Sequence, residues 1–332
     1  MSVFCFTTGV LCRNTAIVAE PVLGQKLQNH ETITGKVSLY IPEFSKPTGR
    51  YVSRLFLRIF NASLRRGSLV FAGNPCTPGI SVLEQEQEAE IRGINKQKGI
   101  RTVVCNYWGM SENADGIVFQ AEPFMLLKMR KGWNSAEDYK QAMLSKYRVR
   151  VNKALQCSQH LKSAWFEGNQ LSDEKIEIMT RLLSATLANK TLALPPDLKS
   201  LIKGFCREYG SDYQTVFCSD NEGNILGFLS AVRQGDKVFA MHIGYHAEFA
   251  REFHLYQRLM LDLIEKFAGN GITEIQLGRT ATEMKSTLGA EPIENSIVIY
   301  TQNIWLKYVL KIYKRFFFRP KTYTLRHPFR EN

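Results

Sequence analysis

The stretch QTVFCSDNEGNILGFLSAVRQGDKVFAMHIG, residues 214–244, decides the fold. Two turn sequences, Asp220–Asn224 and Gln234–Asp236, separate three apolar segments in it, and each turn contains a glycine. Glycine supplies the positive φ angles that tight hairpin turns require. The stretch therefore predicts three consecutive antiparallel strands, at Gln214–Ser219, Ile225–Arg233 and Lys237–Gly244.

A helix and a further strand are expected after this meander. Apolar residues recur at helical spacing over Phe249–Ala268, and Gly269–Gly271 stops the pattern before a strand at Thr273–Leu277. Before the meander, Ser172 with two acids behind it predicts one helix start and Pro195 another. Antiparallel strands, a helix and a strand in this order indicate an α+β domain.

The first half of the chain shows a similar alternation of elements. Apolar runs at Ser68–Ala72 and Ile100–Asn106 predict strands, and the polar segment Ser81–Lys98 between them predicts a surface helix. Two more strands and a capped helix are expected at Gly116–Ala121, Phe124–Lys128 and Ser135–Leu144.

Length and composition indicate a globular protein with two domains. A chain of 332 residues exceeds one ordinary core, and 44% hydrophobic with 22% charged residues is far from the composition of disordered chains. We expect domains at 1–145 and 146–300 and a tail at 301–332. The formal net charge of +12 favours anionic partners: nucleic acid, phosphate-bearing cofactors or an anionic membrane face.

Cysteine usage and the absence of targeting signals suggest a cytoplasmic protein. The seven cysteines have no CxxC or Cys/His ligand spacing, so we expect free thiols and no metal site. Residues 1–13 lack the basic start and long apolar core of a signal peptide. No apolar run reaches the roughly 18 residues of a membrane span, so membrane contact would be peripheral.

Two segments carry a resemblance to a known family. LGRTATEMKSTLGAEP, residues 277–292, resembles a segment of FemAB-like and related GNAT-type acyltransferases in which a strand ends in Gly-Arg and a lysine precedes an apolar residue, a glycine and a small residue. WNSAEDYKQAMLSKYRVRVNKA, residues 133–154, is similar to the element that precedes the core in that family. The matching positions in the first segment are Gly278, Arg279, Lys285, Leu288, Gly289 and Ala290.

The resemblance implies tandem GNAT-like lobes of the α+β class, with mixed, mostly antiparallel sheets flanked by helices. It also implies transfer of an acyl or aminoacyl group to an amine or hydroxyl. The implied donors are acyl-CoA, acyl carrier protein (acyl-ACP) or aminoacyl-tRNA, none of them tightly bound. One segment departs from the ordinary GNAT pattern, because Tyr245–Glu252 contains no Gly-x-Gly pyrophosphate loop. FemAB-like relatives tend to lack that loop too.

Two cations and two glycines become candidate binding residues through this resemblance. Arg279 suits a phosphate or carboxylate, and Lys285 would place a second charge beside it if the segment forms a short helix. The structural alternatives are a surface ion pair and a solvated lysine. Gly278 and Gly289 belong to the same motif.

Three further cations alternate along the chain at the junction of the two expected domains. Lys146, Arg148 and Arg150 would share one face of a strand and form a stripe for phosphate. On a helix they would point in different directions as ordinary solvated charge.

His242 and Tyr256 are the candidate catalytic residues. Acyl transfer needs a base for the acceptor's proton, and His242 on the third strand could supply it, as could His246 or His254. Tyr256 could donate to an oxyanion or protonate the leaving group, or could only pack its ring. A lone histidine is more often a satisfied polar residue than a catalyst.

The leading hypothesis is an acyltransferase that moves an acyl group from a thioester donor to an amine or hydroxyl, for example of a lipid or cell-envelope precursor. The alternatives are an aminoacyl-tRNA-dependent transferase and a non-catalytic GNAT-fold protein that binds a carbohydrate or lipid headgroup. The basic, aromatic segment Trp305–Arg319 has helical spacing and suits an anionic bilayer at the inner face of the membrane. A terminal helix docked on the protein is the other interpretation.

Overall fold

The chain divides into two compact units. The first contains Met1–Pro123, Thr191–Pro196 and Ile293–Thr322, and the second contains Phe124–Lys190, Asp197–Pro292 and Tyr323–Asn332. The expected helix at Ser81–Lys98 lies outside the described residues. The computed structural model describes residues 2–3, 18–19, 68–72, 100–108, 116–187, 198–316, 318 and 322–330.

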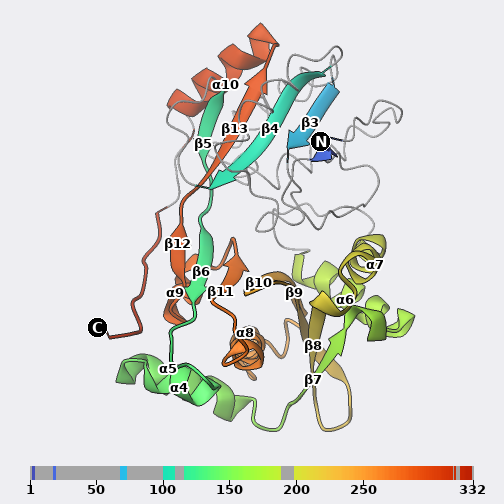
Figure 1. The fold of residues 1–332 in the computed structure, drawn as a ribbon, viewed down its shortest axis with the longest axis vertical. Coiled ribbons are helices and arrows are strands. Elements are labelled where there is room, and N and C mark those ends of the chain that lie inside the picture. Colours follow the sequence, from blue (N-terminus) through green and yellow to red (C-terminus); the bar gives the residue numbers. More distant parts are fainter. Residues whose placement is uncertain are drawn as a thin grey trace. The chain divides into compact units, whose positions relative to one another are not determined.

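A seven-stranded sheet lies at the centre of the second unit (Figure 1). Its strands are β6 (Phe124–Lys128), β7 (Lys162–Glu167), β8 (Tyr213–Ser219), β9 (Ile225–Gln234), β10 (Lys237–Tyr245), β11 (Glu274–Gly278) and β12 (Glu291–Ile293). The spatial order is β12-β6-β11-β10-β9-β8-β7. Strands β6 and β11, β10 and β9, β9 and β8, and β8 and β7 pair antiparallel, whereas β10 and β11 run parallel. The expected mixed, mostly antiparallel sheet is confirmed.

The predicted three-strand meander is present as β8, β9 and β10. Its first turn is closed by Asp220, whose Oδ1 accepts hydrogen bonds from the backbone N–H groups of Glu222 at 2.9 Å and Asn224 at 2.8 Å. Gly223 and Gly235 have φ angles of 88° and 61°, as the turn chemistry requires. Strand β7, which the sequence analysis did not predict, extends the meander at one edge.

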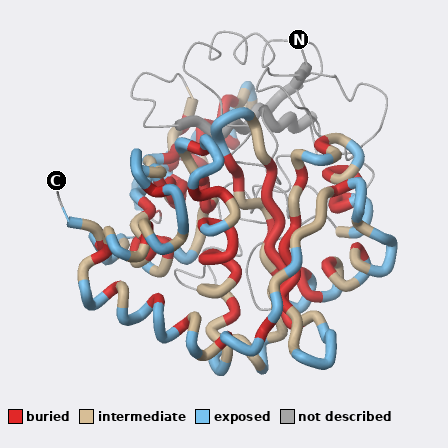
Figure 2. The backbone as a smooth tube through the Cα atoms, turned by 60° about the horizontal axis from the view of Figure 1, so that its bottom comes forward, coloured by how far each residue is buried: buried red, intermediate tan, exposed pale blue. Residues whose placement is uncertain are grey.

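Helices cover both faces of this sheet. They are α4 (Ala136–Gln141), α5 (Ser145–Cys157), α6 (Asp173–Leu187), α7 (Leu198–Tyr209), α8 (Leu255–Phe267) and α9 (Thr282–Thr287). Successive side chains of β8 point to opposite faces. Val216 belongs to the apolar core that contains α8, whereas Tyr213 stacks on Phe205 of α7 at 5.4 Å between ring centroids. Helices α7 and α8 therefore lie on opposite faces. Buried residues follow the strands between them, and exposed residues mark the turns (Figure 2).

The start of α8 differs from the expected one. The apolar pattern predicts a helix from Phe249, but the helix begins at Leu255, after a series of turns. His254, the residue before it, has φ 48° and ψ 41°, a left-handed conformation that cannot continue a helix. By contrast, the predicted cap at Ser172 is confirmed, because its Oγ accepts from the N–H of Lys175 at 3.3 Å.

A buried ion pair holds α8 in place. Arg258 Nε lies 2.8 Å from Asp262 Oδ1, and Arg258 Nη1 donates to the carbonyl oxygen of Ser158 at 3.0 Å. Ser163 Oγ donates to the second carboxylate oxygen at 2.7 Å. The network ties α8 to β7 and to the end of α5, so the start of α8 has a fixed position in the unit.

The first unit contains a four-stranded sheet in the order β3-β4-β13-β5. Its strands are β3 (Ser68–Ala72), β4 (Ile100–Trp108), β5 (Ile117–Gln120) and β13 (Asn295–Thr301), and helix α10 (Ile304–Phe316) packs on β5 and β13. Two short strands, β1 (Ser2–Val3) and β2 (Val18–Ala19), pair with each other in parallel.

The observed units differ from the expected boundaries of 1–145, 146–300 and 301–332. Strand β13 pairs antiparallel with both β4 and β5, so residues 293–322 return to the first unit. The expected tail also divides. Its helix α10 belongs to the first unit, and Tyr323–Asn332 belongs to the second, where Leu144 N donates to Pro328 O at 2.7 Å. Backbone pairing between segments far apart in sequence cannot be inferred from local patterns.

Candidate functional site

The parallel strands β10 and β11 separate before either ends. Only three residue pairs are in register, from Lys237↔Glu274 to Phe239↔Gln276. Beyond them β10 continues along β9 to Tyr245, with an irregular register between Ala240 and Ile243. The carboxyl ends of parallel strands are a common place for ligand binding, because loops and helix N-termini meet there.

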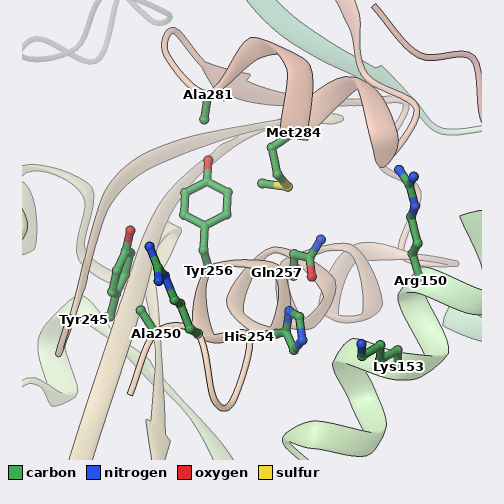
Figure 3. A pocket seen from close by; sticks show the side chains of 10 residues that line it. Arg150, Lys153, Tyr245, Ala250, His254, Tyr256, Gln257, Ala281 and Met284 are labelled. Carbon is green, nitrogen blue, oxygen red and sulfur yellow. The ribbon is translucent and has the colours of Figure 1, made fainter. Parts of the chain in front are cut away.

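A pocket of about 730 Å³ lies at these strand ends (Figure 3). Its volume is within the range of small-molecule sites. Ten residues from α5, the end of β10, the start of α8 and the segment after β11 line it: Arg150, Lys153, Tyr245, Ala250, Arg251, His254, Tyr256, Gln257, Ala281 and Met284.

The pocket is basic. Three of its lining residues, Arg150, Lys153 and Arg251, carry positive charge, and none of the ten is acidic. The N-terminus of the 13-residue helix α8 opens into the same place, and His254 makes no side-chain cap there. The first N–H groups of a helix have no intrahelical acceptor and attract anions. Side chains and backbone therefore favour the same ligand charge.

Two tyrosines form the wall beside the start of α8. The ring centroids of Tyr245 and Tyr256 lie 6.3 Å apart, with the rings nearly perpendicular. Figure 3 shows the Tyr256 hydroxyl directed toward Ala281, across from Arg150 and Lys153. Burial raises the pKa of the Tyr256 phenol well above its ordinary value of 10, and burial also raises that of Tyr245. Both hydroxyls are thus protonated near neutral pH and act as donors.

The alternating cations lie on a helix, so they do not form the stripe that a strand would give. Only Arg150 lines the pocket, joined by Lys153 three residues later on α5. Lys146 Nζ lies 4.9 Å from the ring centroid of Tyr147, and Arg148 Nη1 donates to Gln141 Oε1 at 3.3 Å. The structure separates Lys146 and Arg148 from the pocket because α-helical geometry turns them away.

Lys285 and Arg279 do not line this pocket either. Lys285 is buried in α9, where its Nζ donates to the carbonyl oxygens of Gly278 at 3.2 Å and Arg279 at 2.7 Å. The lysine therefore closes the turn after β11. Arg279 is half-buried, and Gly278 and Gly289 have φ angles of 72° and 88°. These glycines serve backbone conformation.

His242 and Tyr256 are not brought together. The His242 ring packs edge-on against Phe205 of α7 at 5.2 Å, on the opposite face of the sheet from α8. It is buried, and neither ring nitrogen has a hydrogen-bond partner among the described residues. Burial lowers its pKa to about 4. Of the three histidines considered as a base, His254 is the one in the pocket.

The site residues predicted from the sequence do not include Lys153, Tyr245, Arg251, Gln257 and Met284, which also line the pocket. A usable signal was the position of Tyr245–Glu252 directly before the long helix. The ordinary GNAT pattern has a Gly-x-Gly loop at this position. In this protein, side-chain cations and the start of α8 provide the positive charge instead.

Residues 145–286 match the family described as Acetyltransferase (GNAT) domain. A search of curated proteins found no match. Three similar solved structures are L-PGS from Bacillus licheniformis (11% identity, TM-score 0.48, 76% of this chain and 83% of that chain), FemX (11%, 0.46, 75% and 83%) and a tandem GNAT protein from the clavulanic acid biosynthesis pathway (10%, 0.40, 71% and 75%).

The family match contains the whole pocket. All ten lining residues, from Arg150 to Met284, fall within residues 145–286. The chain therefore carries a GNAT acetyltransferase domain, and the protein is an acyltransferase.

Proposed function

We propose that the pocket binds a phosphate-bearing thioester donor, CoA foremost, and that the domain transfers its acyl group to an amine or hydroxyl. The observation that carries this proposal is that three cations, Arg150, Lys153 and Arg251, line one pocket together with the start of α8, which has no side-chain cap. Cations and helix N-termini are the usual partners of phosphate groups. GNAT domains generally use acyl-CoA, which is why CoA ranks before acyl-ACP.

The proposed reaction is a direct transfer. The acceptor's nitrogen or oxygen attacks the thioester carbonyl, a C–N or C–O bond forms, and the C–S bond breaks. His254, which supplies the one imidazole among the ten lining residues, takes the acceptor's proton. Tyr256, protonated near neutral pH, gives its proton to the departing thiolate. An amine or hydroxyl of a lipid or cell-envelope precursor is the proposed acceptor class.

Donor binding can be tested with matched variants of α5. Thermal shifts are measured with CoA, acetyl-CoA and bulk tRNA at about 50 mM and about 200 mM salt, because phosphate contacts weaken with salt. We expect CoA to stabilise the wild type, and Arg150→Gln and Lys153→Gln to reduce that shift. Lys146→Gln, on the same helix and outside the pocket, should leave it unchanged.

The result also separates the alternatives. A shift with tRNA and none with CoA would replace the thioester proposal by an aminoacyl-tRNA-dependent transferase. Equal loss of CoA binding in Lys146→Gln and Lys153→Gln would show that net charge, and not this pocket, holds the donor. If CoA binds, chromatographic detection of free CoA released in the presence of candidate amines establishes transfer. CoA binding without any transfer would favour the non-catalytic alternative.

A further inference from the structure

Helix α10 exposes an apolar face to solvent. Among the described residues, six large hydrophobic side chains are strongly exposed, and five of them lie on this one helix. We call these five the outer face of α10: Ile304 (68% exposed), Trp305 (79%), Tyr308 (62%), Ile312 (52%) and Phe316 (60%).

The outer face is continuous along the helix. With about 100° between successive residues, the five side chains fall within about 120° of arc, over the whole length of α10. Leu306, Leu310 and Tyr313 point the other way and are buried, in contact with the sheet of the first unit. Tyr313 lies 6.4 Å from Phe119 of β5, between ring centroids. The helix is therefore already docked through one face, and the outer face is a second apolar surface.

Positive charge borders the outer face. Four basic residues of α10 are exposed, and the helix contains no acidic residue. By the same helical geometry Arg315 and Lys311 lie at one edge of the apolar arc, and Lys307 and Lys314 lie next to them. Lysine and arginine at such an edge can extend their charged ends toward anionic groups while their aliphatic stems cover apolar surface.

We infer that the outer face of α10 binds the surface of an anionic phospholipid bilayer, with the helix parallel to the membrane plane. Apolar side chains enter the boundary between headgroups and acyl chains, where tryptophan and tyrosine are favoured, and the basic edge meets lipid phosphates. Among the described helices, none has both the length and the apolar sequence of a transmembrane span. This inference does not depend on the proposed acyl donor.

Charge selects the bilayer over a second copy of the chain. An antiparallel two-fold pair of α10 helices would place the four basic residues of one copy near those of the other, with no acidic residue in either helix to neutralise them. An anionic lipid surface satisfies both the apolar side chains and the basic edge.

Vesicle cosedimentation tests the inference with the full chain. Vesicles of equal parts phosphatidylglycerol and phosphatidylcholine should bind the protein, and pure phosphatidylcholine should bind it much more weakly. The variant Trp305→Ser/Tyr308→Ser/Ile312→Ser should lose binding. Val149→Ser is the control, because Val149 is the sixth exposed large hydrophobic residue among those described, 62% exposed and on α5. All replaced side chains are exposed, so thermal midpoints should be close to that of the wild type.

Charge and insertion are tested separately. Lys307→Gln/Lys311→Gln should lower the partition coefficient about fivefold for each lysine removed, and Lys146→Gln should leave it unchanged. Trp305 should contribute a blue shift of fluorescence on vesicle binding that is missing in Trp305→Phe. Equal binding to neutral and anionic vesicles would overturn the inference. So would a dimer, seen by light scattering, that the triple variant dissociates while vesicle binding persists.

Discussion

Lys285 Nζ donates a hydrogen bond to the carbonyl oxygen of Arg279 at 2.7 Å and a second to that of Gly278 at 3.2 Å. The two carbonyls belong to the turn between β11 and α9, in which Thr280 and Ala281 have φ angles of 67° and 49°. A turn with consecutive positive φ angles at residues other than glycine needs support from its surroundings. The buried ammonium group provides that support.

Lys285→Met should therefore destabilise the protein. Methionine has similar volume but no donor, so two turn carbonyls lose a charge-assisted hydrogen bond in a buried place. We expect the free energy of unfolding to fall by about 2–4 kcal/mol, measured by urea denaturation. The exposed Lys146→Met should change it by less than about 0.5 kcal/mol. Equal stability of the two variants would contradict a structural role for Lys285.

Gly289 and Phe329 make a second testable pair. Gly289 has φ 88°, and a Cβ atom built on it would overlap the Phe329 ring at Cε2. Phe329 itself packs against Trp133, with ring centroids 4.9 Å apart. Gly289→Ala should cost about 2–4 kcal/mol, because it combines backbone strain with displacement of that ring.

A double-mutant cycle separates the two causes. In a Phe329→Ala background the steric term disappears, so Gly289→Ala should cost only the backbone strain of about 1–2 kcal/mol. If the two substitutions change the free energy of unfolding additively, as measured by urea denaturation, then the Phe329 ring moves away from the introduced Cβ at no energetic cost.

Local patterns predicted the elements well and their partners poorly. The meander needed only turn glycines and apolar runs, so β8, β9 and β10 follow directly from sequence. Strand β7 is half-buried and has a weakly patterned sequence, and β13 is assigned to the first unit only by pairing with β4 and β5. Such pairing depends on residues far apart in the chain.

The candidate site shows the same limit. Arg150 was a candidate because it alternates with two other cations, and Tyr256 because a phenol can donate a proton, but whether they share a pocket depends on how α5 meets the start of α8. His242 was a reasonable base by residue type and strand position. Successive side chains of a strand point to opposite faces of the sheet, so a shift of one residue would move His242 to the other face. In the structure His242 faces α7.

The burial of His242 predicts a pH dependence of stability. Its pKa is about 4 in the folded protein against about 6.5 when unfolded, so below pH 6.5 the unfolded chain binds a proton that the native state does not. The contribution of His242 to the free energy of unfolding should therefore fall by about 3 kcal/mol between pH 6.5 and pH 4. Unfolding of wild type and His242→Leu by urea at several pH values measures the difference.

The comparison removes the contribution of other titrating groups. As the pH falls from 7 to 4, the free energy of unfolding of His242→Leu should rise by about 3 kcal/mol relative to that of the wild type. The kcat of the variant should stay within about threefold of the wild-type value, because His242 does not line the pocket. If the free energy of unfolding of both proteins changes with pH by the same amount, then the His242 imidazole takes up a proton in the folded protein as well. A kcat reduced about 10²-fold would restore His242 as the candidate base.

Tyr256→Phe tests the proposed proton donor. Phenylalanine keeps the ring that packs beside Tyr245 and removes only the hydroxyl, so kcat should fall about 10²-fold while KM for the donor changes little. Because the pKa of Tyr256 is raised above 10, the wild type should show no loss of activity below pH 10 from deprotonation of this group. Tyr308→Phe, on α10, is the control.

A thioester with a more acidic leaving thiol should shrink the difference in kcat between wild type and Tyr256→Phe, since such a thiolate needs less protonation to depart. A constant difference across leaving groups would assign the hydroxyl to substrate positioning.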